Sequence, residues 1–294
     1  MSNHRVSIAI PDSLVFESRD IRTKTDQLGL IGRYMALFRI NEVIIYRSNS
    51  LKPDEARKER RIIKNILGYM ECPQYLRKTL FHVHRDLQFA GTLPPLATPH
   101  HMVSEQLKDK EYREAVIYLD ANNIVKANVG AKFPVQVINP SKEDLTDVKK
   151  RVSVQLHKNP DSKHFEAEIV PRELIKKKVY WGYDIRFSDI PVNKFSTRKK
   201  EYYIIATSRK GINYQDISQV KDFDPKTNLK KKDLLILFGE PKMGLYDMLK
   251  AHEGTSVKDI CDIIVNTIPN PGTRSVRLEE AVVITLARLI PLFE

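Results

Sequence analysis

In the first seventy residues, short apolar runs typical of strands alternate with stretches whose apolar residues recur at helical spacing. This pattern predicts a β-α-β-α opening. Two short runs, Val6–Ile10 and Val43–Tyr46, have the β-branched composition of buried strands. Between them, apolar residues recur at helical spacing, at Leu28, Ile31, Met35 and Phe38. A second amphipathic stretch follows, and its apolar face consists of Ile62, Ile63, Ile66, Leu67 and Met70. A helix with such a face is expected to cover a sheet.

A glycine- and proline-rich stretch, FAGTLPPLATPHH from Phe89, interrupts regular structure and marks a boundary. Beyond it the chain contains short apolar-rich runs separated by turn residues, and no long helical pattern lies between them. These runs are Val116–Leu119, Ile124–Val129, Phe133–Val137, Val152–Leu156 and Phe165–Val170. The pattern is typical of a small antiparallel barrel.

After residue 178 the α/β pattern returns. Three apolar runs, Tyr202–Ala206, Leu234–Phe238 and Asp262–Val265, each end in a polar or glycine-containing loop, as parallel strands of a covered sheet do. A last helix is predicted over Val276–Leu289, with acidic residues in its first turn and Arg288 in its last, as the helix dipole favours. The simplest architecture is one α/β domain made from both ends of the chain, with a β-rich module inserted in its middle.

Length and charge add a class of partner. A chain of 294 residues usually holds one large domain or a main domain with a smaller one, so we expect two cores. Lysine and arginine total 49 against 37 acidic residues, and the net charge of +12 attracts polyanions, nucleic acid above all. Charge alone leaves open a second interpretation, a solvated lysine-rich surface.

The cysteines and the amino terminus bear on the compartment. Cys72 and Cys261 lie far apart and lack partners at metal-ligand spacing, which favours two buried thiols in a reducing compartment. The first apolar run is too short for a signal peptide, and no stretch approaches the ~18 apolar residues of a membrane span. We therefore expect a soluble, cytoplasmic protein without a membrane partner.

A group of histidines near Cys72 raises the alternative of a zinc site. Its members are His82, His84, His100 and His101. Their spacing matches no standard zinc site, and a Gly/Pro loop separates the two pairs. We expect structural or RNA-contacting histidines and no metal.

Ligands of an open α/β sheet collect beyond the carboxyl ends of its strands. Three loops lie there in the predicted sheet: Ala206–Gly211, Phe238–Gly244 and Asn266–Thr273. None contains a Walker A lysine or a GxGxxG pattern, so triphosphate and dinucleotide sites lack support.

Glycines in the second and third of these loops suggest another kind of ligand. Gly239, Gly244 and Gly272 would let the backbone approach a ligand closely or adopt positive φ, which suits an adenosine bound by main-chain groups. The alternative is three ordinary tight turns.

At these loops the sequence resembles a known family. The stretch NTIPNPGTRSVRLEEAVVITLARL from Asn266, with LLILFGEPKMGL before it, resembles the C-terminal signature of SPOUT-class RNA methyltransferases. The segments ECPQYLRK from Glu71, DLQFAG from Asp86 and PHHM from Pro99 resemble one branch of that class, the archaeal and eukaryotic RNA (uridine-N3) methyltransferases. The resemblance covers nearly the whole chain, and its motifs fall in the family's order.

The resemblance implies an α/β fold with a trefoil knot, which proteins generally avoid, and an inserted small β-barrel that is OB-like. It assigns residues 1–90 and 173–294 to a SPOUT methyltransferase domain with a C-terminal knot. Residues 91–172 become the inserted RNA-binding domain. Members of the family act as homodimers, so a second copy of the chain is an expected partner.

The resemblance also implies S-adenosylmethionine (SAM) as the cofactor, bound by the three loops. The residues carried over by motif are Ala206, Thr207, Phe238, Gly239, Glu240, Gly244, Val265, Asn266, Ile268, Asn270, Gly272, Thr273 and Val276. One residue departs from the family pattern. Pro271 stands where relatives often have glutamine or glycine, and proline has no N–H to donate to a cofactor.

A second match concerns catalysis. The segment Gln27–Arg33 resembles the first SPOUT motif, in which an arginine reaches the reaction centre, so Arg33 is the first catalytic candidate. The alternative for Arg33 is a solvated or dimer-interface residue, because interfaces also favour arginine.

Methyl transfer from a sulfonium is an in-line displacement, in which positioning is the main demand on the protein and no metal is needed. If uridine N3 is the acceptor, its proton must leave and negative charge must spread onto the flanking carbonyl oxygens. Arg33, Arg274 or Arg277 would stabilise that charge. Glu279 would take the proton, or would serve only as a partner of the helix dipole.

RNA contacts are expected from basic residues in and outside the barrel. The candidates are Arg22, Lys132, Arg209, Lys210 and Arg274. The predicted activity is methylation of N3 of a uridine in large-subunit ribosomal RNA. Two alternatives remain: a methyltransferase acting on a ribose 2′-oxygen or another base atom, or a non-catalytic RNA-binding or ribosome-assembly factor with the same fold.

Overall fold

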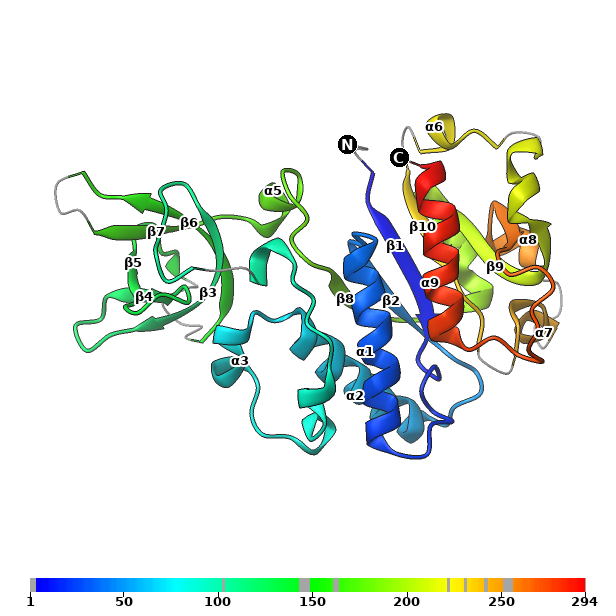
Figure 1. Ribbon diagram of the computed structural model, residues 1–294, viewed down its shortest axis with the longest axis horizontal. Helices are drawn as coiled ribbons and strands as arrows, with labels where there is room; N and C mark the ends of the chain where they lie inside the picture. The colour runs from blue at the N-terminus through cyan, green and yellow to red at the C-terminus, as the bar shows by residue number, and fades with distance from the viewer. Residues whose placement is uncertain are drawn as a thin grey trace. The chain divides into compact units, whose positions relative to one another are not determined.

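The computed structural model describes residues 4–101, 104–142, 149–160, 164–220, 223–229, 232–240, 243–250 and 256–293. The chain divides into two compact units, shown in Figure 1. The sheet unit consists of residues 1–68, 89–95 and 183–294. The barrel unit consists of residues 69–88 and 96–182. Helix α3 (Gln74–Leu80) and Trp181 pack with the barrel strands and belong to the barrel unit, whereas residues 91–95 belong to the sheet unit.

Six parallel strands form the sheet unit, in the order β11-β9-β10-β1-β2-β8. Their bounds are β1 Val6–Pro11, β2 Glu42–Arg47, β8 Asp184–Pro191, β9 Tyr202–Asn213, β10 Asp233–Leu237 and β11 Ile263–Asn266. Five of these strands coincide with runs predicted from the sequence, and the predicted parallel sheet is confirmed. Strand β8 was not predicted, because an edge strand with the sequence DIRFSDIP has no apolar run.

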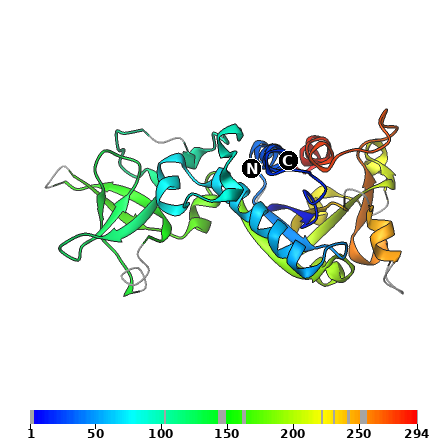
Figure 2. The same ribbon diagram turned by 90° about the horizontal axis from the view of Figure 1, so that it is seen from below.

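Helices α1 (Ile21–Leu37) and α9 (Leu278–Leu289) lie side by side on one face of the sheet, as Figures 1 and 2 show. Helix α1 begins after Asp20, whose carboxylate caps the N–H of Thr23 at 2.8 Å. Helix α2 (Pro53–Glu71) is joined to α1 by a buried ion pair between Lys24 and Glu59, with 2.5 Å between Nζ and Oε1.

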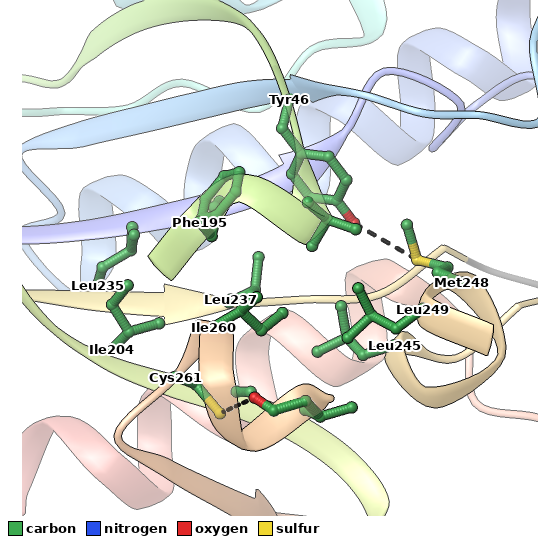
Figure 3. Close-up of a cluster of buried hydrophobic side chains, with 14 of the residues drawn as sticks. Tyr46, Phe195, Ile204, Leu235, Leu237, Leu245, Met248, Leu249, Ile260 and Cys261 are labelled. Atoms are coloured by element: carbon green, nitrogen blue, oxygen red, sulfur yellow. Dashed lines mark hydrogen bonds between the residues drawn. The ribbon is translucent and has the colours of Figure 1, made fainter. Parts of the chain in front are cut away.

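Side chains of each strand point alternately to the two faces of the sheet, and a second apolar layer packs against the other face. Strand residues such as Leu235 and Leu237 pack there against Phe195 of the 3₁₀ segment η4 (Val192–Lys200). Helices α7 (Leu245–Lys250) and α8 (Val257–Ile260) complete the layer, as Figure 3 shows. Both cysteines are buried and free, as predicted.

The other helices within the described residues are short. They are α5 Arg172–Lys176, α6 Pro225–Asn228 and the 3₁₀ turns η1 Arg85–Leu87, η2 Ala90–Thr92, η3 Pro99–His101, η5 Tyr214–Gln219 and η6 Ile290–Leu292.

Five strands of the barrel unit form a closed barrel in the order β3-β4-β5-β7-β6. Their bounds are β3 Tyr112–Leu119, β4 Val125–Asn128, β5 Val135–Val137, β6 Arg151–Lys158 and β7 Phe165–Ile169. Four neighbouring pairs are antiparallel, but β5 and β7 pair in parallel. The prediction of a wholly antiparallel barrel was wrong at this pair, because local periodicity does not reveal which strands become neighbours.

The two motifs ECPQYLRK and PHHM meet inside the barrel unit. The Nε2 atoms of His100 and His101 donate to the Glu71 carbonyl at 2.9 and 2.8 Å. Gly182 adopts φ 78° beside them, and a Cβ at this position would lie 2.5 Å from the Glu71 carboxylate. Among the described residues, no group of three or more histidine, cysteine or acidic side chains could hold a metal ion. His100 and His101 thus both hold the Glu71 carbonyl, at the end of α2.

Candidate cofactor pocket

A pocket of about 610 Å³ lies in the sheet unit, at the carboxyl ends of β9, β10 and β11. The three loops predicted from the sequence all contribute to it. Its lining consists of Thr207, Ser208, Arg209, Lys210, Phe238, Gly239, Glu240, Gly244, Tyr246, Asp247, Asn266, Thr267, Ile268, Pro271, Arg274, Ser275, Val276, Leu278, Ala281 and Thr285.

The first predicted loop, Ala206–Gly211, is instead part of strand β9, and a break in the register between β9 and β11 separates most of it from β11. Ile264 pairs with Ala206, but the next residue of β11, Val265, pairs with Ile212. The segment Thr207–Gly211 therefore has no partners in this ladder and is available to line the pocket. Gly211 makes this crossing possible, since a Cβ there would lie 2.6 Å from the backbone carbon of Val265.

The second loop is fixed by hydroxyl groups from the end of β2. The Tyr46 hydroxyl donates to the Phe238 carbonyl at 2.7 Å. The hydroxyls of Ser48 and Ser50 lie 2.6 and 2.7 Å from the two carboxylate oxygens of Glu240. Residues 241 and 242 of this loop lie outside the described residues. The sequence did not predict these hydroxyl contacts, because the two serines lie beyond the apolar run of β2, where the chain bends.

The third loop is joined to the first through Asn266. Its amide Oδ1 accepts from the N–H of Ile268 at 3.0 Å, and its Nδ2 donates to the Arg209 carbonyl at 3.2 Å. The left-handed residue of this loop is Asn270, with φ 52°. Asparagine tolerates this conformation better than most residues.

The sequence left two alternatives for Gly239, Gly244 and Gly272, close approach of a ligand or positive φ, and none of the three adopts positive φ. The space around two of them is open instead. A Cβ at Gly244 or Gly272 would meet no atom within 4 Å, whereas one at Gly239 would lie 3.0 Å from the Leu245 backbone nitrogen. Open space beside a backbone is what close approach of a ligand requires.

Most of the predicted cofactor residues line the pocket. They are Thr207, Phe238, Gly239, Glu240, Gly244, Asn266, Ile268 and Val276. The others lie in the same strands and loop without appearing in the lining: Ala206, Val265, Asn270, Gly272 and Thr273. Residues of the lining that the sequence did not point to include Tyr246, Thr267 and Thr285.

Two of those residues form a polar floor. The hydroxyls of Thr267 and Thr285 lie 2.8 Å apart, and both side chains are buried. The pair joins the end of β11 to α9. Because two hydroxyls carry two protons and the contact between them uses one, the pair keeps one donor for a polar atom in the pocket.

The predicted catalytic residues are not among the residues that line the pocket. Arg33 donates from Nη1 to the Pro95 carbonyl at 3.0 Å. Glu279 is buried and accepts from Gln27 of α1 at 3.4 Å. Arg277 is exposed just before α9. The single chain therefore does not bring these three side chains together in the pocket.

The predicted RNA-contacting residues are divided between the two units. Arg209, Lys210 and Arg274 are exposed residues of the pocket lining, so they give it a positive rim. The Lys210 ammonium lies 5.2 Å from the ring centroid of Tyr246, a cation-π contact. Arg22 is exposed at the start of α1, and Lys132 is exposed on the barrel unit.

The fold and the pocket define a class of protein: an α/β protein with a pocket at the carboxyl ends of parallel strands, which is where open α/β sheets bind their ligands. The family described as "Putative RNA methyltransferase" matches residues 5–289. The chain belongs to this family.

Several characterised and uncharacterised proteins are similar to the chain over nearly its whole length. The human "28S rRNA (uridine-N(3))-methyltransferase" is 31% identical over 318 residues, which cover 98% of this chain and 78% of that protein. The protein of the same description from Drosophila melanogaster is 31% identical, and the matched region covers 97% of this chain and 61% of the Drosophila protein. An uncharacterized protein of Halobacterium salinarum is 27% identical, and the matched region covers 96% of this chain and 98% of that protein.

Among solved structures, the SpoU methyltransferase AviRb from Streptomyces viridochromogenes, in complex with the cofactor AdoMet, aligns with the whole chain and with 60% of its own. Its identity is 10% and its TM-score 0.28, so this likeness carries no argument. In the described part of the chain, no helix combines the length and the apolar character that a membrane span requires.

Proposed function

We propose that this protein is a SAM-dependent RNA methyltransferase that methylates N3 of a uridine in large-subunit ribosomal RNA. The observation that carries the proposal is the pocket, which stands where three loops resembling those of SPOUT methyltransferases converge, in a chain of an RNA methyltransferase family. The relatives named 28S rRNA (uridine-N(3))-methyltransferases support the acceptor atom and the substrate.

The residues of the pocket fit SAM. The volume of about 610 Å³ lies within the range of small-molecule sites. Open space at Gly244 and Gly272 admits an adenosine next to the backbone, and Glu240 offers negative charge to a cationic ligand. When bound, SAM supplies an activated methyl group on a sulfonium. The protein must hold this donor in line with the acceptor nitrogen, and the three joined loops provide the rigidity for that.

The positive rim suits the other substrate. Arg209, Lys210 and Arg274 would bind RNA phosphates, which positions the acceptor without specifying its sequence. Arg277 is exposed and follows Arg274 of the rim by three residues in the sequence. It would stabilise negative charge on the uridine carbonyl oxygens. Glu279 is buried against Gln27, so the role best supported for it is holding α9 to α1.

We propose that the protein acts as a homodimer in which Arg33 of one protomer serves the pocket of the other. Leu30 and Leu37 of α1 are 41% and 59% exposed. They are seven residues apart and therefore share a helix face, and Arg33 lies close to that face. An apolar face of this kind beside an arginine suits an interface with a second copy, and a dimer would let Arg33 act where its own chain does not bring it.

Two features of the fold support the finer family assignment. The chain leaves the sheet at the outer strand β11, beyond β9, and returns to pack α9 beside α1, a path consistent with a trefoil knot. The closed five-stranded barrel, whose β5 and β7 pair in parallel, supports an OB-like RNA-binding module with Lys132 on its surface. The location we propose is the cytoplasm.

The test uses unmodified transcripts of large-subunit ribosomal RNA, incubated with the purified protein and SAM that carries an isotopic methyl group. We expect labelled 3-methyluridine by nucleoside mass spectrometry and a new reverse-transcription stop, because a methyl group at N3 blocks the pairing edge. Label recovered as a ribose methyl without such a stop would replace the N3 assignment with 2′-O chemistry. SAM binding without label in any nucleoside would favour the non-catalytic factor.

A further inference from the structure

The end of β2 contributes to the pocket although none of its residues lines it. Three hydroxyl side chains lie at the end of β2 and in the bend that follows it: Tyr46, Ser48 and Ser50. The Tyr46 hydroxyl binds the Phe238 carbonyl, and Figure 3 shows its ring pointing towards the buried layer that includes Met248. All three hydroxyls therefore contact the second loop of the pocket.

The two serines bind both oxygens of one carboxylate. Ser48 Oγ lies 2.6 Å from Glu240 Oε1, and Ser50 Oγ lies 2.7 Å from Oε2. The serine hydroxyls are also 2.6 Å from each other, and the N–H of Ser50 donates to Ser48 Oγ at 3.0 Å. Glu240 is thus held from both sides of its carboxylate by a compact pair of hydroxyls, which we call the serine clamp.

The serine clamp is itself anchored below the pocket. The N–H of Ser48 donates to Asp12 Oδ1 at 2.9 Å, and Arg60 Nε donates to Asp12 Oδ2 at 2.8 Å. Asp12 is fully buried, and Ser48 is 1% exposed. Arg60 continues to the end of β8, where it binds the Ser188 carbonyl at 3.0 Å. A network that joins β1, β2, β8 and α2 thereby fixes the position of one side chain in the pocket.

The charge of Glu240 remains available to a ligand. Within the described part of the chain no lysine, arginine or histidine forms an ion pair with it, and its partners are the neutral hydroxyls of the clamp. A half-buried carboxylate that is held by neutral donors keeps its attraction for a cation, and a site of low dielectric strengthens that attraction. SAM carries two positive centres, its sulfonium and its ammonium.

We propose that Ser48 and Ser50 are positioning residues of the cofactor site, which hold Glu240 so that its negative charge recognises the cationic end of SAM. This inference rests on the proposed function. It extends the site to the segment Tyr46–Ser50, at and beyond the end of β2, which contacts the cofactor loop at Glu240 and at the Phe238 carbonyl.

The experiment measures binding by isothermal titration of the full chain, with three probes that differ in charge. They are SAM, S-adenosylhomocysteine, which lacks the sulfonium charge, and 5′-methylthioadenosine, which lacks both positive centres. The variants are S48A/S50A, E240Q, the triple variant that combines them, and T197A. The last removes an exposed hydroxyl of η4 that binds the Lys194 carbonyl, and it is the matched control.

We expect S48A/S50A and E240Q each to weaken SAM binding by roughly tenfold, as hydrogen bonds to charged groups imply. Binding of 5′-methylthioadenosine should change less than about twofold, because that probe offers Glu240 no cation. The triple variant should be no weaker than E240Q, since the serines act through Glu240. The homocysteine probe then identifies the cation: a loss equal to that of SAM assigns the ammonium, and no loss assigns the sulfonium.

A merely structural role for the serines would weaken SAM and 5′-methylthioadenosine alike, and that result overturns the proposal. So does unchanged SAM affinity in S48A/S50A, or a triple variant whose losses add. If circular dichroism shows that S48A/S50A does not fold, S50A alone and E240Q decide the question, because Ser50 is exposed. Wild-type protein that binds none of the probes sinks the proposed function itself, whereas normal wild-type binding with unaffected variants sinks only the clamp.

Discussion

Arg151 of β6 holds Glu71, the last residue of α2, with 2.6 Å between Nη1 and Oε2. Burial by itself would raise the pKa of Glu71, but Arg151 and Arg172 outweigh it and hold this pKa well below its usual range. Arg151 also binds Glu114, at 2.6 Å. This pair links the motif that begins at Glu71 to the wall of the barrel.

Replacing Arg151 by methionine should lower the free energy of unfolding of the barrel unit by about 3 kcal/mol, since it leaves the buried Glu114 without its arginine and removes one of the two arginines that hold Glu71. The measurement is urea unfolding followed by the fluorescence of Trp181, the one tryptophan of the sequence, which is buried in this unit. The matched control is R57A, which breaks an exposed pair with Asp54 and should cost no more than ~1 kcal/mol. Equal losses in the two variants would contradict the assignment.

Stability of the barrel unit should fall as the pH drops below ~6.5, because of His101. Burial is the main cause that lowers the pKa of this imidazole to about 4. The unfolded chain therefore binds a proton that the folded unit does not bind between pH ~6.5 and about 4. The stabilisation is complete above the unfolded pKa and is lost as the pH falls towards the folded pKa. Urea unfolding at several pH values measures it.

The H101Q variant should flatten that pH dependence, because glutamine keeps a donor for the Glu71 carbonyl without titrating. If the stability of H101Q depends on pH as steeply as that of the wild-type protein over this range, another group causes the effect.

Alanine at two glycines of the segments that border the pocket should separate folding from binding. G211A forces a Cβ to 2.6 Å from the Val265 backbone and should destabilise the sheet unit by about 2 kcal/mol, as overpacking does. G272A meets no atom within 4 Å, so its stability should stay within ~0.5 kcal/mol of wild type. Its SAM affinity should fall several-fold. Thermal unfolding and titration with SAM measure the two effects, and a stable G272A with wild-type affinity would show that no ligand approaches there.

Arg33 gives a test of the dimer. R33A and G244A should each have low methylation activity, one for want of the arginine and the other for want of cofactor binding. If Arg33 acts on the other protomer's pocket, mixing the two variants restores up to a quarter of the wild-type activity, because some mixed dimers contain one complete site. No recovery, with exchange of protomers verified by mass spectrometry, would place the action of Arg33 within its own chain.

Lys132 and Phe133 should contact RNA. The Phe133 ring is 71% exposed, and the Lys132 ammonium lies 5.6 Å from its centroid. Base stacking on aromatic rings is worth about 1–3 kcal/mol, so F133A should weaken RNA binding by roughly tenfold. K132A should instead lower the salt dependence of binding, by a slope of about 1. Filter binding at several salt concentrations measures both, and L174A, on the exposed Leu174 of the same unit, is the control.

The sequence by itself determined the elements whose signal is local. Strands β1, β2, β9, β10 and β11 follow from apolar runs, because burial on both faces requires continuous hydrophobicity. The three loops of the pocket followed as well, since the carboxyl ends of parallel strands meet at one edge. The family resemblance added the cofactor and eight of the residues that line the pocket, which no hydrophobic period could supply.

Only the tertiary structure decided what depends on neighbours. The polar edge strand β8, the parallel pairing of β5 with β7 and the serine clamp on Glu240 join residues far apart in the chain, so no local period carries them. The position of Arg33 also depends on the tertiary structure. The motif assigned this residue to the reaction centre, whereas the fold places it beside Pro95. Sequence patterns record which face of an element is buried, whereas packing alone determines what that face meets.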